Sequence, residues 1–330
     1  MVSLPDNITL LAQSPGLKPT MTEVIVILPT FRRPGHLRKT LDSLILQQTQ
    51  RIFAVIVMEN DAEKREGAEA VTKLFTADTL SGMLIIAHDR GNCSAYNAGF
   101  ITALQRFPTF SYLLIIDDDE IADPHWIERM CSAAEEQTSD IVGGPQVPMF
   151  AVSGFQRLES HPVFHPPYRK SGRVKALYSS GNLLIARDVL EAMGPPHLDL
   201  RFNFLGGGDS DFLSRSAEQG YRLGWCAEAP VFETVPARRT KPDWIRSRAI
   251  RNGVISTLVE RKKRAGDPLG RIKTIAKSLA LLVASPLRGL VDLVKTGSLS
   301  VGLYPVYVAF GRLAAEFGYI NEQYRQAEKN

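Results

Sequence analysis

The chain has 330 residues and a net charge of +4, and 44% of its residues are hydrophobic and 22% charged. This composition is ordinary for a globular protein and excludes a disordered chain, and the length allows one large α/β domain with an extension. The three cysteines lie far apart and form no CxxC pair, which argues against a disulfide scaffold or a zinc site and favours a reducing compartment.

Residues 1–22 contain no basic segment followed by a long apolar run, so we expect a flexible tail without a secretory signal and a cytoplasmic protein. Four short apolar runs, separated by helical patterns, then predict strands at 23–30, 52–58, 83–88 and 112–116. Leu37, Leu41 and Leu44, for example, recur at the spacing of an amphipathic helix. Strands that alternate with helices predict an α/β fold with a mainly parallel sheet between helices.

Polar clusters end two of these runs. Glu59, Asn60 and Asp61 follow the second run, and Asp117-Asp118-Asp119 follows the fourth. In parallel sheets ligands bind beyond the carboxyl ends of the strands, so we expect both clusters to meet in one crevice. Three adjacent carboxylates repel one another, and Mg²⁺ or Mn²⁺, bound together with a substrate phosphate, removes that repulsion. The alternative is a plain acidic turn between a strand and a helix.

A glycine run at 206–208 precedes Asp209 and Asp211. Glycine lets the backbone approach a ligand closely or adopt a positive φ. A carboxylate beside an acceptor hydroxyl can act as a general base, so Asp209 is a candidate catalytic residue. The alternative is a glycine loop with an aspartate that caps a helix.

The segment from 238 to 273 holds twelve Lys and Arg against three Asp and Glu. It predicts phosphates or an anionic membrane surface as neighbours, and a solvated basic helix is the alternative. Arg246, Arg248 and Arg251 lie in this segment, and guanidinium groups bind diphosphates through paired hydrogen bonds.

Two apolar stretches follow, at 275–287 and 299–311, and both are shorter than a membrane-spanning helix requires. We therefore predict that residues 238–330 form a helical extension that docks peripherally on the cytoplasmic face of a membrane. The alternative is that these helices pack on the catalytic domain or form a homodimer contact.

The order of the motifs resembles family 2 glycosyltransferases with the GT-A fold, over residues 23–255. The segments that carry the resemblance are LPTFRRPGHLRKTLDSLILQQ, VMENDA, HDRGNCSAYNAGF, IIDDDE, SSGNLLIARDVL and GGGDSDF. The chain is most similar to bacterial exopolysaccharide transferases of the succinoglycan type, which work at the inner membrane. We accordingly predict a GT-A catalytic domain at 23–237, whose nucleotide-sugar half extends to about residue 150 and whose acceptor half follows.

For the donor, the resemblance implies that Asn60, with Glu59 or Asp61, contacts the nucleobase and that Asp117 contacts the ribose. It implies that Asp119, with Asp117, holds the metal on the diphosphate. The same motifs assign five further residues to the donor site, namely Pro29, Thr30, Arg32, Asn97 and Asp118.

For the acceptor side, the resemblance implies that Asp209 is the base and that Asp211 orients Asp209 or a sugar hydroxyl. It also implies that Arg248 or Arg251 reaches the diphosphate. The chain departs from the family pattern at three places: Gly208 replaces a glutamate, Glu59 replaces an aspartate, and Val231-Phe232-Glu233 stands where relatives often carry a metal-binding histidine.

These observations predict an inverting hexosyltransferase that moves a sugar from a nucleotide diphosphate donor, expected to be a UDP-sugar, to an acceptor hydroxyl. The resemblance implies a lipid-linked oligosaccharide acceptor in exopolysaccharide or cell-surface glycan synthesis, and no nucleic-acid partner is expected. One alternative is a nucleotidyltransferase, which should carry a glycine-rich loop after its first strand, where Pro29 to Arg33 contain no glycine. The other is a non-catalytic partner subunit that keeps the fold.

Overall fold

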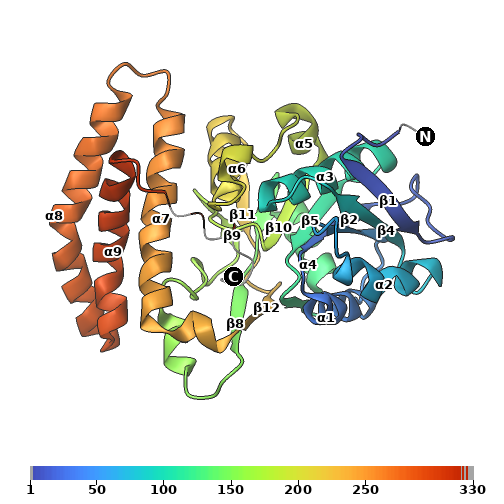
Figure 1. The fold of residues 1–330 in the computed structure, drawn as a ribbon, viewed down its shortest axis with the longest axis horizontal. Coiled ribbons are helices and arrows are strands. Elements are labelled where there is room, and N and C mark those ends of the chain that lie inside the picture. The colour runs from blue at the N-terminus through green and yellow to red at the C-terminus, as the bar shows by residue number, and fades with distance from the viewer. Residues whose placement is uncertain (1–2, 321, 323–324, 326–330) are drawn as a thin grey trace. The chain divides into compact units, whose positions relative to one another are not determined.

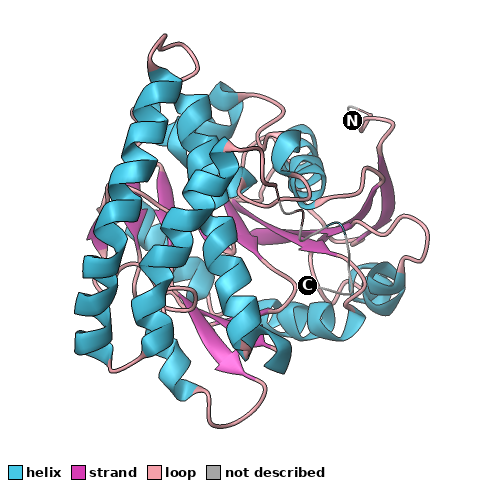
Figure 2. Cartoon of the chain, turned by 60° about the vertical axis from the view of Figure 1, so that its left-hand side comes forward, coloured by secondary structure: helices cyan, strands magenta, loops and turns pink. Residues whose placement is uncertain are grey.

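The structure is a computed structural model that describes residues 3–320, 322 and 325. Contacts divide the chain into two units, and we call Met1–Gln146 with Tyr168–Glu233 the sheet unit. The second, Val147–Pro167 with Thr234–Asn330, is the helical unit. Figures 1 and 2 show the strands and helices that build the two units. The division into a catalytic domain and an extension that begins at residue 238 stays a prediction.

Nine strands form the main sheet of the sheet unit. They are β1 (Ile8–Gln13), β2 (Val24–Thr30), β3 (Phe53–Glu59), β4 (Gly82–Ala87), β5 (Tyr112–Ile116), β7 (Ile141–Gly143), β9 (Gly172–Arg173), β10 (Asn182–Ala186) and β11 (Leu223–Trp225). Their order in the sheet is β1-β4-β3-β2-β5-β10-β7-β11-β9. A smaller sheet has the order β6-β12-β8, formed by β6 (Glu120–Ala122), β12 (Val231–Val235) and β8 (Gln146–Phe150).

The four predicted strands are β2, β3, β4 and β5, and they run parallel at the centre of the sheet. The sheet as a whole is mixed, because β10 runs antiparallel to both of its neighbours, β5 and β7. The predicted parallel pattern therefore holds for β2 to β5. Outside these strands the sheet is mixed: β1 is antiparallel to β4, β9 is antiparallel to β11, and β11 is parallel to β7.

Helices cover both faces of the main sheet (Figure 1). On one face α1 (Pro34–Ile45), α2 (Glu66–Thr76) and α4 (Trp126–Glu136) share a hydrophobic core with β2 and β3. On the other face lies α3 (Asn92–Arg106). It packs closely against Met58 of β3 at Gly99, where an added Cβ would lie only 2.9 Å from the Met58 sulfur. Short α5 (Arg187–Met193) and α6 (Gly208–Glu218) complete the sheet unit, and the Phe212 ring of α6 stacks on Phe100 of α3.

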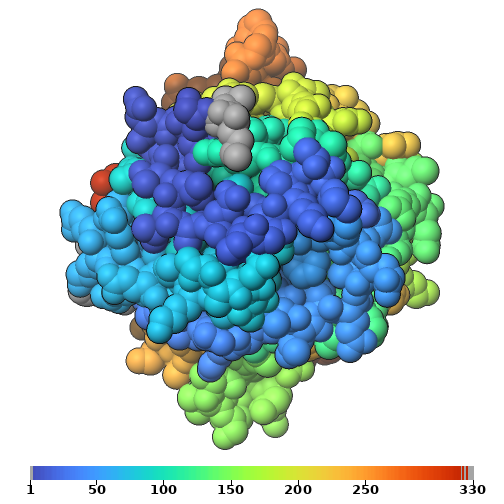
Figure 3. Space-filling view, turned by 90° about the vertical axis from the view of Figure 1, so that its right-hand side faces the viewer, coloured from blue at the N-terminus to red at the C-terminus, as the bar shows by residue number. Residues whose placement is uncertain are grey.

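The expected flexible tail at residues 1–22 is wrong for its central part, because β1 lies in it. β1 pairs antiparallel with β4, from Ile8 opposite Ala87 to Gln13 opposite Met83. The N-terminal segment that the structure describes, dark blue in Figure 3, lies on the surface of the sheet unit. The sequence does not predict this strand, because its partner lies some seventy positions away in the chain. Of its apolar residues only Ile8 and Ala12 are buried, so it has no continuous apolar run that marks a strand.

The helical unit contains α7 (Pro242–Lys263), α8 (Gly270–Thr296) and α9 (Leu299–Glu316). Short 3₁₀ helices at Gln156–Ser160 and Ala237–Thr240 belong to the same unit, and the 3₁₀ helix Leu200–Phe202 lies in the sheet unit. An ion-pair network around the buried Glu260 joins the long helices: Glu260 of α7 accepts from Arg312 of α9 at 2.5 Å and from Lys277 of α8 at 3.0 Å. These ion pairs outweigh the burial that would raise the pKa of Glu260, and this pKa is lowered.

Glycines allow α7 and α9 to approach closely, which gives a first testable prediction. A Cβ at Gly311 would lie 2.0 Å from the Ile250 carbonyl oxygen, a backbone atom that cannot move aside alone. We expect Gly311→Ala to lower the free energy of unfolding by about 1–3 kcal/mol, as overpacking does. Urea unfolding measures it. Gly266→Ala is the control, since nothing lies within 4 Å of its added Cβ, and equal stability of the two variants would contradict the prediction.

Candidate active site

A cluster of carboxylates lies at the carboxyl end of β5. Asp118 and Glu120 are 6% and 0% exposed, and Asp117 is half-buried beside them. Glu120 accepts a hydrogen bond from the Asp117 backbone N–H at 2.8 Å. Glu233 of β12 lies opposite Glu120 in the small sheet, so its charge acts on the same cluster. The predicted run of three aspartates is therefore part of a larger acidic site.

Side chains from β2, α1 and α3 hold this cluster in place. Thr30 donates to Asp118 at 2.9 Å, and the Tyr96 hydroxyl of α3 donates to Asp117. Thr40 of α1 donates to the backbone carbonyls of Asp118 and Glu120. Strand ends and helix faces that lie far apart in the sequence thus fix the direction of each carboxylate.

Arg33 is a site residue that the sequence analysis missed. Its Nη1 lies 3.1 Å from Asp118 Oδ1 and 3.0 Å from Asp119 Oδ2, so one guanidinium bridges two carboxylates. Its position in the loop after β2 could have revealed it, because that loop lies beside the end of β5 in a parallel sheet.

Burial and mutual repulsion disfavour the ionised form of the carboxylates in this cluster. Burial and the charge of Asp119 raise the pKa of Asp117 to about 7. Burial raises the pKa of Asp118 to about 6 against the opposing charge of Arg33. Burial and the charge of Asp117 raise the pKa of Glu120 well above its ordinary value. A nearby cation would restore the ionised state of these groups.

The donor set fits a divalent cation of the Mg²⁺ or Mn²⁺ type. The side chains of the cluster that could bind a metal ion are all carboxylates. Mg²⁺ and Mn²⁺ bind one or two carboxylates together with substrate phosphate and water. Among the residues that the structure describes, no group of three or more His, Cys, Asp or Glu side chains is arranged to hold a metal ion, so the protein would supply fewer than three such ligands. The side chain of Asp119 is 12% exposed and that of Asp118 is 8% exposed, so Asp119 is the more open of these two carboxylates.

The turn after β3 holds the residues predicted to contact the nucleobase. Glu59 is fully buried and accepts from the backbone N–H groups of Asp61 and Ala68, both at 2.9 Å. Asn60 donates to the carbonyls of Ala87 and Asp89 and accepts from the Gly91 N–H. These bonds make Glu59 and Asn60 supports of the turn, and Asp61 is the member of the trio that pairs with an exposed side chain, Arg32.

Arg32 and Asp61 form an ion pair of 2.6 Å next to an aromatic ring that the sequence analysis did not select. Two guanidinium groups lie over the Phe31 ring, that of Arg32 at 4.9 Å and that of Arg90 at 5.1 Å from the ring centroid. Pro29, the penultimate residue of β2, precedes Phe31 in the chain. The loops after β2, β3 and β4 together therefore present a ring, two cations and a carboxylate. A planar, polar base is the kind of ligand that such groups stack on and bind.

Asn97 of α3, another predicted donor residue, is 7% exposed and bonded to the backbone of Leu198. Its Nδ2 donates to the Leu198 carbonyl at 2.8 Å, and its Oδ1 accepts from the Leu198 N–H at 2.9 Å. In this structure Asn97 therefore ties the segment before α6 to α3.

We expect Asn97→Ala to lower the free energy of unfolding by about 2 kcal/mol or more, because two buried backbone groups lose their partner. Urea unfolding measures the loss. Asn7→Ala, which removes one exposed hydrogen bond to Asp89, should cost much less. If Asn97→Ala lowered the free energy of unfolding no more than the control does, the structural role of Asn97 would be contradicted.

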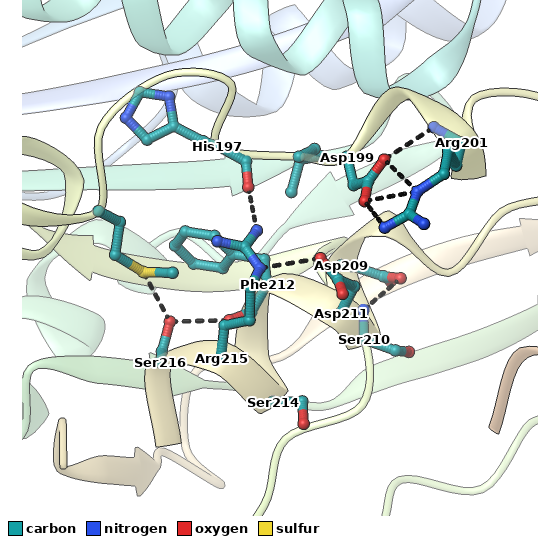
Figure 4. Close-up of polar contacts among 12 residues, drawn as sticks. His197, Asp199, Arg201, Asp209, Ser210, Asp211, Phe212, Ser214, Arg215 and Ser216 are labelled. Atoms are coloured by element: carbon teal, nitrogen blue, oxygen red, sulfur yellow. Dashed lines mark hydrogen bonds and ion pairs between the residues drawn. The ribbon is translucent and has the colours of Figure 1, made fainter. Parts of the chain in front are cut away.

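The glycine run leads into the acceptor-side segment. Gly206 and Gly207 have φ angles of 82° and 94°, which favour glycine, and α6 begins at Gly208. Asp209 is therefore the second residue of the helix, and its Oδ1 accepts from the Ser210 N–H at 2.7 Å (Figure 4). Asp211 is 1% exposed and pairs with Arg215 at 2.9 Å. Asp209 is thus the more accessible of the two predicted catalytic carboxylates.

Arg215 and Arg201 fix the surroundings of this segment, as Figure 4 shows. Arg215 also donates to the His197 carbonyl, and Arg201 pairs with Asp199 at 2.7 Å. Asp211 is therefore held through Arg215 to the loop before α6, which suits the orienting role that the sequence predicts for it.

The first turns of α3 bring the two clusters together. Burial, followed by the charges of Asp209 and Asp199, raises the pKa of Cys93 to about 12. A Cβ at Gly208 would lie 2.5 Å from the Cys93 sulfur, so Cys93 fills the space beside this glycine. Tyr96, which bonds Asp117, is three residues further on, and residues at this spacing are neighbours on one helix face. The acidic cluster and Asp209 therefore flank the same face of α3.

The two arginines predicted for the diphosphate, Arg248 and Arg251, lie on α7 in the helical unit. Arg251 is 3% exposed. Their contact with a diphosphate stays a prediction.

Comparison with known proteins identifies the family. The model of glycosyl transferase family 2 matches residues 25–194. The chain belongs to this family. This family 2 glycosyltransferase is 28% identical over 229 residues to the succinoglycan biosynthesis protein ExoM of Rhizobium meliloti (strain 1021). The alignment covers 68% of this chain and 71% of that protein. The predicted family, with its relation to exopolysaccharide enzymes, is confirmed.

Solved structures confirm the GT-A fold of the transferase. The mannosyltransferase PcManGT from Pyrobaculum calidifontis, in complex with GDP-Man and Mn²⁺, has a TM-score of 0.55 at 18% identity and covers 90% of each chain. S. aureus TarS 1–349 in complex with UDP has a TM-score of 0.52 at 12% identity and covers 90% of this chain and 91% of that one. The longer TarS structure matches 86% of this chain, which spans 55% of its length.

Proposed function

We propose that this glycosyltransferase moves a hexose from a nucleotide diphosphate sugar to an acceptor hydroxyl, with inversion at the anomeric carbon and with the help of a divalent cation. The observation that carries the proposal is the placement of the carboxylates on both sides of one face of α3. Tyr96 bonds Asp117 on the donor side, and Cys93 packs beside Gly208 on the acceptor side. A donor held at one cluster would therefore present its sugar toward the other.

The proposed reaction is a single displacement. The acceptor oxygen attacks the anomeric carbon as the bond from that carbon to the diphosphate oxygen breaks, and Asp209 takes the acceptor proton. Attack from the face opposite the leaving group inverts the configuration. Asp211, held by Arg215, orients Asp209 or a sugar hydroxyl. Positioning of the two reactants supplies several kcal/mol, and a well-placed general base adds roughly 10²–10⁴-fold.

On the donor side, Asp119 with Asp117 would hold Mg²⁺ or Mn²⁺. When bound, the ion neutralises charge on the departing diphosphate. Arg33 would keep Asp118 and Asp119 in position in the absence of the ion, because it bridges both carboxylates. Asp61, Arg32 and Phe31 would bind the nucleobase, with Glu59 and Asn60 as supports of that turn.

The relatives support the finer parts of the proposal. TarS is solved with UDP and with UDP-GlcNAc, and PcManGT with GDP-Man and Mn²⁺, which supports a nucleotide-sugar donor and a divalent cation. ExoM, a succinoglycan biosynthesis protein, supports a saccharide acceptor in exopolysaccharide synthesis. We propose UDP-sugar as the donor, a lipid-linked oligosaccharide as the acceptor and the inner face of the cell membrane as the location.

A panel of nucleotide sugars tests the proposal. We expect a UDP-sugar, in the presence of Mn²⁺, to raise the melting temperature and to be hydrolysed slowly to UDP, with both effects lost on chelation. A nucleotidyltransferase would instead release pyrophosphate from a nucleoside triphosphate and a sugar phosphate. A non-catalytic subunit would bind the donor without releasing UDP. Either of these results would replace the proposed function.

A further inference from the structure

Helix α8 buries small and polar side chains and exposes large apolar ones, which is the reverse of a surface helix in a soluble protein. Its buried residues are small or polar, namely Gly270, Thr274, Ser278, Ser285 and Gly289. Its outward face carries large apolar side chains at Ile272, Leu279, Val283, Leu287, Leu290 and Val294. Val283 and Val294 are 82% and 78% exposed, so the row lies open along the whole helix. We call these six side chains the outer row.

The outer row has a basic border. Helix α8 contains five Lys and Arg and a single acidic residue, Asp292. Because successive helical residues are turned by about 100°, Lys277, Arg288 and Lys295 share one side of the helix, between the outer row and the buried face. All three are exposed. An apolar face bordered by cations is the pattern of a helix that lies in the headgroup region of an anionic bilayer.

The inner face of α8 is fixed to its neighbours, which favours an in-plane position over a spanning one. Lys277 pairs with Glu260 of α7, and a Cβ at Gly289 would lie 2.2 Å from the Gly302 carbonyl of α9. The 27-residue helix is long and apolar enough to cross a membrane. Crossing, however, would place Lys277, Arg288 and Asp292 in hydrocarbon, where charged side chains are costly.

The helix stays continuous through Pro286, so the outer row is not broken. A proline in a helix removes the N–H that would bond the carbonyl four residues earlier, here that of Leu282. The Ser285 hydroxyl donates to this carbonyl at 2.8 Å and supplies the missing hydrogen bond. The apolar residues on both sides of Pro286 therefore remain on one face.

We propose that the outer row of α8 is the surface by which the protein binds an anionic lipid membrane, with the helix parallel to the bilayer plane. The proposal deepens the membrane location given under the proposed function. Its test uses neither donor nor acceptor, so that failure of lipid binding and failure of sugar transfer are separate results.

Flotation with vesicles tests the proposal on the full chain. We expect the protein to float with vesicles of phosphatidylcholine and phosphatidylglycerol, to float less with phosphatidylcholine alone, and to be partly released by high salt because the basic border is screened. A variant with Val283→Glu and Leu287→Glu should bind about tenfold less or weaker still, because two apolar side chains no longer enter the bilayer. Leu46→Glu is the matched control, since Leu46 and Leu287 are both 69% exposed.

Three outcomes would overturn the proposal. The first is no flotation, or equal flotation of the double variant and the Leu46→Glu control. The second is binding that resists an alkaline carbonate wash, because a spanning helix resists extraction and an in-plane helix does not. The third is self-association of the wild type in sedimentation experiments without lipid, lost in the double variant, which would assign the outer row to a second copy of the chain. Urea unfolding verifies that both variants are folded.

Discussion

Asp209→Asn is expected to leave donor affinity unchanged and to lower turnover by about 10²–10⁴-fold. The amide is nearly isosteric with the carboxylate, and its oxygen can still accept from the Ser210 N–H. It cannot take the acceptor proton, however, so the loss falls on the chemical step and not on binding. Titration calorimetry with the donor nucleotide and rates of UDP release with acceptor present measure the two effects separately.

Two further variants make this result specific. Asp188→Asn is the matched control, because Asp188 is also the second residue of its helix, α5, and is exposed. It tests whether losing a charge at a helix N-terminus is enough to slow turnover, and we expect no effect. Asp211→Asn should weaken the pair with Arg215 and cost stability as well as activity. Near-normal turnover in Asp209→Asn would make Asp211 the better candidate for the base.

Asp119→Ala is expected to remove most of the cation-dependent donor affinity, by roughly 10²-fold or more, while the fold persists. The Asp119 side chain is more exposed than that of Asp118, and its removal relieves charge repulsion on Asp117, whose pKa the charge of Asp119 raises. The variant should therefore unfold at a urea concentration no lower than the wild type does. Calorimetry of UDP binding, with and without Mn²⁺, measures the affinity.

Asp42→Ala is the control for this experiment, since Asp42 is 49% exposed and forms only a surface pair with Arg38. It should bind UDP like the wild type in both conditions. Equal affinity of Asp119→Ala and wild type with Mn²⁺ present would exclude Asp119 as a metal ligand and would leave Asp117 and Glu233 as candidates.

Local patterns predicted the central part of the fold well. β2 to β5 are buried on both faces, so each is a continuous apolar run in the sequence, and α1 carries its buried leucines at helical spacing. The acidic run at the end of β5 and the glycines before α6 were visible because adjacent carboxylates repel one another and a positive φ favours glycine.

Long-range contacts explain what the sequence did not predict. Arg33 bridges Asp118 and Asp119 across 85 and 86 positions, and Tyr96 reaches Asp117 from another element. Nothing local separates Arg33 from its neighbour Arg32. The resemblance implies that Glu59 and Asn60 contact the nucleobase, and this stays a prediction. Their hydrogen bonds to the turn after β3 were not visible in the sequence.

The edge position of β1 has a practical consequence. The family match begins at residue 25, and a chain shortened to that point would lack β1. β4, whose six residues are all buried, would then become the outermost strand, with one row of backbone N–H and C=O groups uncovered. Apolar strands with open edges pair with other molecules. A shortened enzyme should therefore aggregate during expression or refolding, even though every candidate catalytic residue is still present.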